Sequence, residues 1–140
     1  MRSICFLLVL PTAFSLMLNA QDSKAAAQIE YGRYLVEEVG KCQECHTPKL
    51  ESGELDKSKW LQGAVLDYGP LKEIKDWHKA SPGLTTDGRL WERWKEEGIR
   101  NFLMTGLNPR GGKAGPPMPT YKLKAADADA VIAYLKSLKK

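Results

Sequence analysis

The sequence predicts an all-α fold. Three stretches, around residues 29–39, 91–103 and 125–138, carry apolar residues at the three- to four-residue spacing of amphipathic helices. Strand signals are weak along the whole chain. Its 140 residues suffice for one ordinary domain, and the 27% of charged residues is typical of a soluble globular protein. The net charge of +4 is too mild for a dedicated nucleic-acid binder, but it is compatible with docking to an acidic partner.

The first twenty residues predict a secretory signal peptide. An early arginine precedes an apolar run over residues 4–10, and the small residue Ala20 offers a cleavage point. An uncleaved anchor is the alternative, but Pro11 interrupts the run, which is short of the ~20 apolar residues that a span needs. We therefore expect residues 1–20 to be removed near Ala20 and residues 21–140 to form one domain. The protein is then periplasmic or otherwise exported, and touches membranes only peripherally.

The mature chain is expected to open with a helix. Residues 21–27 are polar or small, and we expect a flexible lead-in whose alanines begin this helix. Apolar residues from Ile29 to Val39 recur at near-helical spacing, so the helix is predicted to end near Gly40. Gly32 inside it costs about 1 kcal/mol relative to alanine. Close approach of a second helix would explain that glycine.

Cys42, Cys45 and His46 form a C-x-x-C-H sequence, which is the attachment signature of a c-type haem. Each thiol adds across one haem vinyl group, and the His46 imidazole then lies against the iron as an axial ligand. The two residues between the cysteines let one turn of backbone present both sulfurs to one porphyrin edge. The third cysteine, Cys5, leaves with the signal peptide. We expect one covalently attached haem c.

Three other interpretations of the cysteine pair compete with haem. A zinc site needs about four ligands, and beyond the motif only His78 is on offer. A thioredoxin-like pair needs a βαβ context, of which the sequence gives no sign. A bare disulfide leaves the adjacent His46 unexplained. His78 is also a candidate for the iron, although a surface position is the commoner fate for a histidine beside Trp77.

The segment after the motif is the least regular. Pro48 stops any continuing helix, and we expect a nearby backbone carbonyl to accept the Nδ1–H of His46, which leaves Nε2 for the iron. Residues 50–80 show no sustained period. We expect loops and short turns there, packed on the haem through Trp60 and Trp77.

A third helical pattern follows, with apolar residues between Trp91 and Leu103. Thr86 or Asp87 is expected to cap its start, and Gly106 to stop it. The last helix is predicted from about Ala125 to Leu138. It has acidic residues in its first turn and lysines in its last, but Lys124 is a poor residue for its N-cap position.

The second axial ligand is expected from the glycine- and proline-rich loop over residues 108–119. Prolines on both sides of Met118 restrict the backbone to extended shapes, so this loop loses less entropy when its thioether is fixed. Met104 is the main alternative, although its helical spacing favours core packing. An iron held by His46 and Met118 is six-coordinate and closed, which suits electron transfer rather than oxygen binding.

The chain resembles class I cytochromes c of the small exported bacterial type. Four motifs in this order carry the resemblance: Tyr31-Gly32-Arg33-Tyr34-Leu35-Val36, Cys42-Gln43-Glu44-Cys45-His46-Thr47-Pro48, Gly115-Pro116-Pro117-Met118-Pro119 and Ala130-Val131-Ile132-Ala133-Tyr134-Leu135-Lys136-Ser137-Leu138. The resemblance implies three to five helices around one covalent haem. It also implies that the first and last helices cross where Gly32 meets Tyr134, and that His46 and Met118 are the axial pair. The segment over residues 50–80 has no firm match in the shorter family members.

The implied function is that of a monohaem electron carrier, not an enzyme. It would take one electron from a dehydrogenase or respiratory complex and pass it to an oxidase or another cytochrome. One alternative is a tightly bound haem subunit of a single dehydrogenase. Another is a haem peroxidase or gas sensor, which needs an open iron position. Lys41, Lys49, Arg110 and Lys113 are candidates to steer an acidic partner, or are solvated surface.

Overall fold

The computed structural model describes the backbone of residues 12–138 and the side chains of residues 21–138. The elements in chain order are α1 (Thr12–Tyr34), the π-helix η1 (Leu35–Val39), α2 (Gln43–His46), the 3-10 helix η2 (Lys57–Lys59), β1 (Gly63–Val65), β2 (Ala80–Pro82), α3 (Arg89–Thr105) and α4 (Ala125–Ser137). Helices dominate, and the two strands form one small antiparallel sheet. The predicted all-α class is confirmed.

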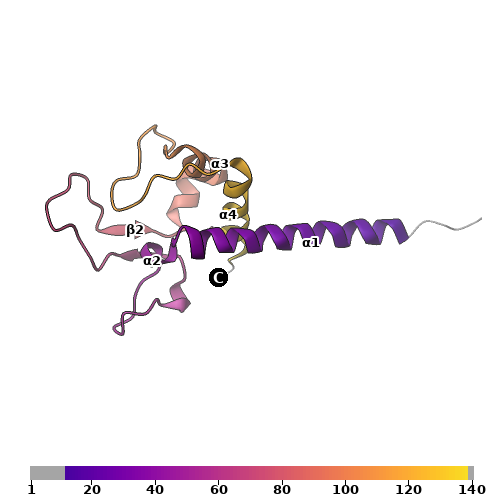
Figure 1. Ribbon diagram of the computed structural model, residues 1–140, viewed down its shortest axis with the longest axis horizontal. Helices are drawn as coiled ribbons and strands as arrows, with labels where there is room; N and C mark the ends of the chain where they lie inside the picture. Colours follow the sequence, from indigo (N-terminus) through magenta and orange to yellow (C-terminus); the bar gives the residue numbers. More distant parts are fainter. Residues whose placement is uncertain (1–11, 139–140) are drawn as a thin grey trace, which may run out of the picture.

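Helix α1 begins earlier than the sequence led us to expect. Residues 21–27 are helical and continuous with the rest of α1, so the expected flexible lead-in is wrong. The reason is local, because Ala25–Ala27 are strong helix formers and the helix meets no glycine or proline before Gly32. In Figure 1, α1 projects well beyond the other elements.

The predicted leader lies mostly outside the described part of the chain. Residues 1–11 are outside it, whereas residues 12–20 form the first part of α1. Within the described residues, none of the helices combines the length and the apolar character that a bilayer span requires.

The second half of α1 crosses α4, as the resemblance implied (Figure 1). Gly32 is buried at this crossing, where an added β-carbon would lie 1.9 Å from the Ala130 carbonyl oxygen and 2.9 Å from Cβ of Tyr134. The glycine predicted to allow close approach of a second helix therefore does so. Nearby, the Tyr134 hydroxyl donates to the Glu37 carboxylate and accepts a 3.2 Å hydrogen bond from the Trp60 indole N–H.

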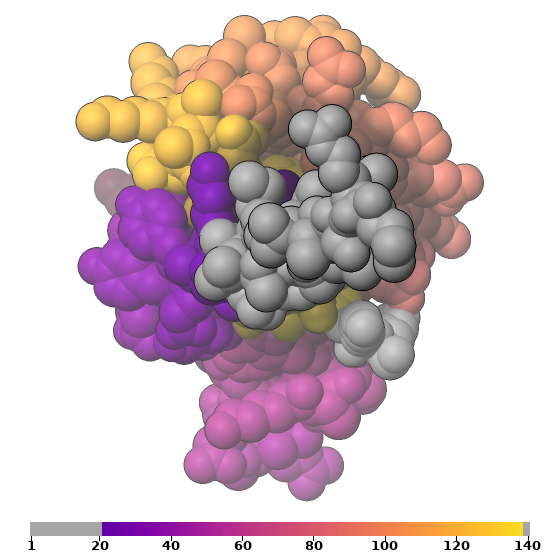
Figure 2. Space-filling model, turned by 90° about the vertical axis from the view of Figure 1, so that its right-hand side faces the viewer, coloured from indigo at the N-terminus to yellow at the C-terminus, as the bar shows by residue number. Residues whose placement is uncertain are grey.

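The core lies between η1, α3 and α4, with Leu61 entering from the segment before β1. Seen along α1, the residues of α4, in yellow, lie beside those of α1, in indigo (Figure 2). The segment around residues 50–65, in magenta, projects at the bottom of this view. The buried core residues are Val36, Leu61, Trp91, Ile99, Val131, Ile132, Tyr134 and Leu135.

The small sheet was not predicted. β1 pairs antiparallel with β2, so that Gly63 lies opposite Pro82. Ser81 fastens this hairpin to α2, because its hydroxyl donates to the Cys45 carbonyl and accepts from the Ala64 N–H at 3.1 Å. Strands of three residues show no readable alternation, which is why residues 50–80 resembled plain loop.

The ends of α3 and the start of α4 agree only in part with the predicted caps. α3 starts at Arg89 with Gly88 in the N-cap position, so the expected cap at Thr86 or Asp87 is wrong. Gly106 ends α3 in the left-handed conformation at φ 76°, as predicted. α4 follows Lys124, which provides no side-chain cap, as its residue type led us to expect.

Candidate functional site

One helical turn presents the two cysteines. The Cys42 N–H donates to the Val36 carbonyl at 2.9 Å, which joins the start of α2 to η1. Inside the turn, the Cys42 carbonyl accepts from the Cys45 N–H at 3.2 Å and from the His46 N–H at 2.9 Å. Before it, Lys41 takes the left-handed conformation at φ 49° and lets the chain reverse. Both sulfurs and the imidazole therefore come from one compact turn.

His46 is oriented by a backbone carbonyl, as the sequence led us to expect. Its ring Nδ1 lies 2.7 Å from the Pro82 carbonyl oxygen, and only 4% of the residue is exposed. A carbonyl can only accept, so Nδ1 carries the hydrogen and Nε2 keeps a free lone pair. Burial lowers the pKa of His46 below its usual value. The imidazole is therefore neutral at pH 7 and prepared to bind a metal through Nε2.

Each thiol has a tyrosine hydroxyl beside it. The Tyr68 hydroxyl lies 3.2 Å from Sγ of Cys45. The Tyr121 hydroxyl lies beside Cys42 and donates to the Gly40 carbonyl at 3.0 Å. Burial raises the pKa of Cys42 to about 11, so this thiol keeps its hydrogen at pH 7. Neither tyrosine was singled out from the sequence, where no motif marks them.

A mainly apolar cavity of about 350 Å³ opens above the cysteines and His46. α2 forms one wall, the hairpin and the loop after it form another, and α3, α4 and the loop between them complete it. Its lining residues are Val36, Cys42, Cys45, His46, Leu66, His78, Ala80, Ser81, Pro82, Leu84, Leu90, Trp94, Ile99, Phe102, Leu103, Asn108, Lys113, Ala114, Gly115, Pro117, Met118, Pro119, Tyr121, Val131 and Leu135. Its volume falls in the range of cofactor sites.

The candidate second ligands differ in position. Met118 lines the cavity and is partly buried. Met104 is not among the lining residues, and its sulfur accepts a 3.2 Å hydrogen bond from Arg100. His78 also lines the cavity but is exposed. The structure thus brings Met118 and His78 to the same cavity as His46, and leaves Met104 outside it.

The Met118 loop is fastened to the end of the hairpin. The His78 N–H donates to the Pro116 carbonyl at 2.8 Å. Gly115 approaches the same segment so closely that a β-carbon would lie 2.5 Å from the Asp76 carbonyl oxygen and 2.7 Å from Nε2 of His78. Residues 76–78 therefore hold the Met118 loop against the cavity.

The expected tryptophan packing is wrong. The Trp60 indole N–H donates a hydrogen bond to the Tyr134 hydroxyl, and Trp77 packs edge-on against Tyr68. Neither tryptophan lines the cavity. Trp94 of α3 does line it. The pattern of α3 marked Trp94 as apolar, but periodicity alone does not separate a cavity wall from core.

The residues proposed to steer a partner have different surroundings. Lys41 pairs with Glu38 at 2.9 Å, and Lys49 pairs with Asp67 at 3.0 Å. Lys113 lines the cavity mouth. Arg110 is exposed in the same loop.

The donor set and the lining fit a haem. Two cysteine sulfurs lie at one edge of a mainly apolar cavity, and a neutral imidazole held through Nδ1 faces into it. The thioether of Met118 lines the same space. For the zinc alternative, the described residues contain no group of three His, Cys, Asp or Glu side chains placed to hold a metal ion.

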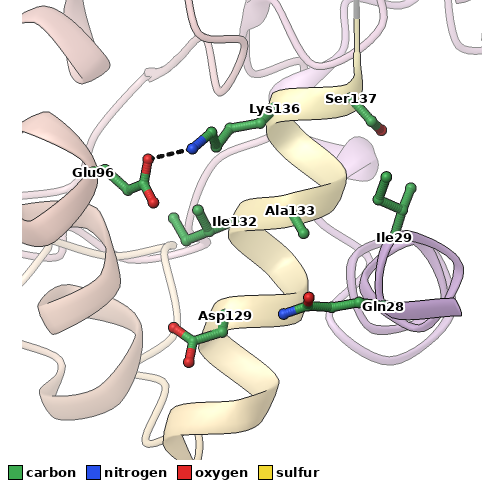
Figure 3. Close-up of a pocket in the computed structure, with 8 residues that line it drawn as sticks. All are labelled: Gln28, Ile29, Glu96, Asp129, Ile132, Ala133, Lys136 and Ser137. Atoms are coloured by element: carbon green, nitrogen blue, oxygen red, sulfur yellow. Dashed lines mark hydrogen bonds and ion pairs between the residues drawn. The ribbon is translucent and has the colours of Figure 1, made fainter. Parts of the chain in front are cut away.

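A second hollow, of about 440 Å³, lies between α1, α3 and α4 (Figure 3). Across it Lys136 of α4 pairs with Glu96 of α3 at 2.7 Å, as the dashed line shows. The remaining charged residue of its lining, Asp129, pairs with Arg100. None of the predicted site residues lines this hollow.

Comparison with known proteins gives a consistent picture. The family described as Cytochrome c matches residues 29–139. A protein named diheme cytochrome c-type from Cereibacter sphaeroides is 38% identical over 82% of this chain and 37% of its own length. The fructose dehydrogenase cytochrome subunit of Gluconobacter japonicus is 29% identical over 92% of this chain and 29% of its own length. The gluconate 2-dehydrogenase cytochrome c subunit of Pantoea cypripedii is 33% identical over 85% of this chain and 27% of its own length.

These relatives are longer proteins. This chain spans little more than a third of the first and less than a third of the other two. The similarity extends over most of this chain, including the cysteine motif and the Met118 loop, which both lie inside the matched family region.

Proposed function

Because the chain belongs to the cytochrome c family, whose members carry covalently bound haem c and transfer electrons, we propose that it is a monohaem electron carrier of the periplasm. One haem c would be joined to Cys42 and Cys45, with His46 and Met118 as axial ligands. The haem supplies the one-electron couple. The main support is that these four side chains line a single apolar cavity.

The chain's own residues have distinct tasks in this proposal. Each thiol would add across one vinyl double bond, with its sulfur bonding one carbon and its hydrogen passing to the other, so the addition would need no oxidant. Pro82 holds the His46 ring by its Nδ1–H, which fixes the tautomer and directs Nε2 at the metal. The apolar walls exclude water, and low polarity around the site is one of the factors that set reduction potential.

Met118 is proposed as the second ligand over Met104 and His78. In favour of Met118 are its position in the cavity and the prolines that flank it. A closed His/Met iron favours electron transfer over peroxidase chemistry or gas sensing. We therefore propose that no substrate is chemically transformed at this site.

The experiment starts with the mass of the mature chain, which should exceed the protein mass by one haem. The oxidised protein should show the charge-transfer band of a methionine–iron bond. M118A should lose this band, while M104A and H78A keep it. A band that survives M118A would contradict the ligand assignment, and a mature chain without attached haem would contradict the function.

A second candidate is a haem subunit bound tightly to one dehydrogenase. Two relatives are named as cytochrome subunits of dehydrogenases, which favours this version. Size-exclusion chromatography of the extract from the natural host separates the two. A free carrier elutes as a small protein no larger than the 15.6 kDa of the full chain, whereas a subunit co-elutes with a much larger dehydrogenase.

Export is proposed from the amino-terminal pattern. Cleavage after Ala20 would leave a mature chain that begins inside α1, at Gln21, and keeps the whole α1–α4 crossing. Amino-terminal sequencing of the protein from the cell envelope checks this point. A chain that retains residues 1–20 would instead favour a membrane-attached form.

A further inference from the structure

Tyr68 is held in place from two sides. Its hydroxyl lies 3.2 Å from Sγ of Cys45. Its ring packs edge-on against Trp77, with the ring centroids 6.1 Å apart. Although 45% of Tyr68 is exposed, these contacts direct its hydroxyl at the sulfur that is proposed to carry the haem.

The direction of this hydrogen bond follows from the chemistry of the sulfur. A free thiol can donate or accept, so either atom can be the donor in the unattached protein. A thioether sulfur has no hydrogen and can only accept. Among the described residues, the Cys45 sulfur is the one hydrogen-bond partner of the Tyr68 hydroxyl. After attachment, the hydroxyl is therefore the donor.

The tyrosine beside the other cysteine has a different partner. The Tyr121 hydroxyl donates its hydrogen to the Gly40 carbonyl at 3.0 Å, although it lies beside Cys42. Its single hydrogen is therefore already used. The two sulfurs of the motif are not equivalent, because only Cys45 has a tyrosine free to donate to it.

We propose that Tyr68 is a positioning residue that donates a hydrogen bond to the thioether sulfur of Cys45 and thereby raises the reduction potential of the haem. This inference rests on the proposed function. An O–H donated to this sulfur would place positive partial charge beside the attached haem, where it would favour the reduced state with its additional electron. Hydrogen bonding around a metal centre is a recognised determinant of its potential.

The first test is a redox titration of the holoprotein with a tyrosine-to-phenylalanine variant at each of two positions. Y68F should have a lower potential than the wild type. Y31F is the matched control, because Tyr31 is similarly exposed and its hydroxyl bonds to Asp127 at 3.0 Å in the α1–α4 region. Its potential should equal that of the wild type. If Y68F and Y31F both titrate as the wild type does, the inference is overturned.

The second test uses the wild type alone and does not depend on how well Y68F matures. In the reduced, diamagnetic holoprotein, the ring protons of Tyr68 next to its hydroxyl should show a nuclear Overhauser effect to the β protons of Cys45. Absence of this contact would also overturn the inference. If the wild type carries no attached haem, the proposed function fails, and this inference with it. If both cysteines hold the haem but the potential of Y68F equals that of the wild type, only the role of Tyr68 is refuted and the proposed function stands.

Discussion

Gly32 of α1 and Ala130 of α4 meet backbone to backbone, with space at position 32 for a hydrogen but not for a methyl group. A β-carbon there would lie 1.9 Å from the Ala130 carbonyl oxygen and 2.6 Å from its carbonyl carbon. These atoms belong to the backbone and cannot turn aside. The distance between the first and last helices therefore depends on one glycine.

We predict that G32A destabilises the fold by about 1–3 kcal/mol, because the two helices must move apart. The better helix propensity of alanine, worth about 1 kcal/mol, offsets only part of this cost. Denaturant unfolding of the holoprotein measures the change. G69A is the control, because no atom lies within 4 Å of a β-carbon there. Equal stability of the two variants would contradict the close packing.

The buried Thr47 hydroxyl gives a second prediction. Thr47 is 1% exposed, and its Oγ1 accepts a 2.9 Å hydrogen bond from the Leu61 N–H. T47V keeps the shape of the side chain but leaves a buried N–H without its partner, at a cost of about 1–3 kcal/mol. T47S retains the hydroxyl and should recover most of the difference. The denaturant midpoints of the wild type, T47V and T47S measure these differences in stability.

A third prediction concerns pH and Tyr134. Burial, with the hydrogen bond to Glu37, raises the pKa of Tyr134 to about 12 from its ordinary value near 10. Because the folded pKa is the higher one, the stabilisation is fully present below pH ~10 and is lost as the pH rises towards about 12. The unfolding free energy of the wild type should fall over this window.

Y134F lacks the ionising group, so its unfolding free energy should fall less steeply between pH 10 and 12. Other tyrosines titrate in both proteins, and the difference between the two curves isolates Tyr134. Parallel curves would show that the hydroxyl of Tyr134 does not couple to folding.

A fourth prediction concerns loss of the haem. Replacing both Cys42 and Cys45 by serine prevents covalent attachment. Without the haem, the apolar lining of this cavity faces water instead of a bound group. The folding free energy of a small domain is only about 5–15 kcal/mol, so the loss of this burial is a large fraction of it. The far-ultraviolet circular dichroism of C42S/C45S should therefore show much less helix, whereas an unchanged spectrum would mean that the fold does not depend on the haem.

The helices were the predictable part of this fold, because a period near 3.6 residues survives in the sequence wherever one face is buried. The start of α1 was missed for a different reason. The polar and small residues 21–27 suggested a flexible lead-in, but they continue the helix without a break. The start of α3 was placed at residues that offer good caps, whereas the structure begins it after Gly88, without a side-chain cap.

The site could be read from the sequence only where a motif marks it. Cys42, Cys45 and His46 are adjacent in sequence and belong to one turn, and the flanking prolines single out Met118. Pro82 is 36 residues from His46 and acts through its backbone carbonyl, which no side-chain pattern can indicate. Tyr68 and Ser81 likewise reach Cys45 only because the unpredicted hairpin folds back on α2.

The hairpin also determines where this chain can change in length. Its returning end supplies the Pro82 carbonyl to His46 and the His78 N–H to the Met118 loop, so residues 78–82 connect opposite walls of the cavity. The turn before it makes no such connection at Leu71, which is fully exposed. Insertions should therefore be tolerated around Leu71, whereas a single deletion between His78 and Pro82 would shift both walls at once.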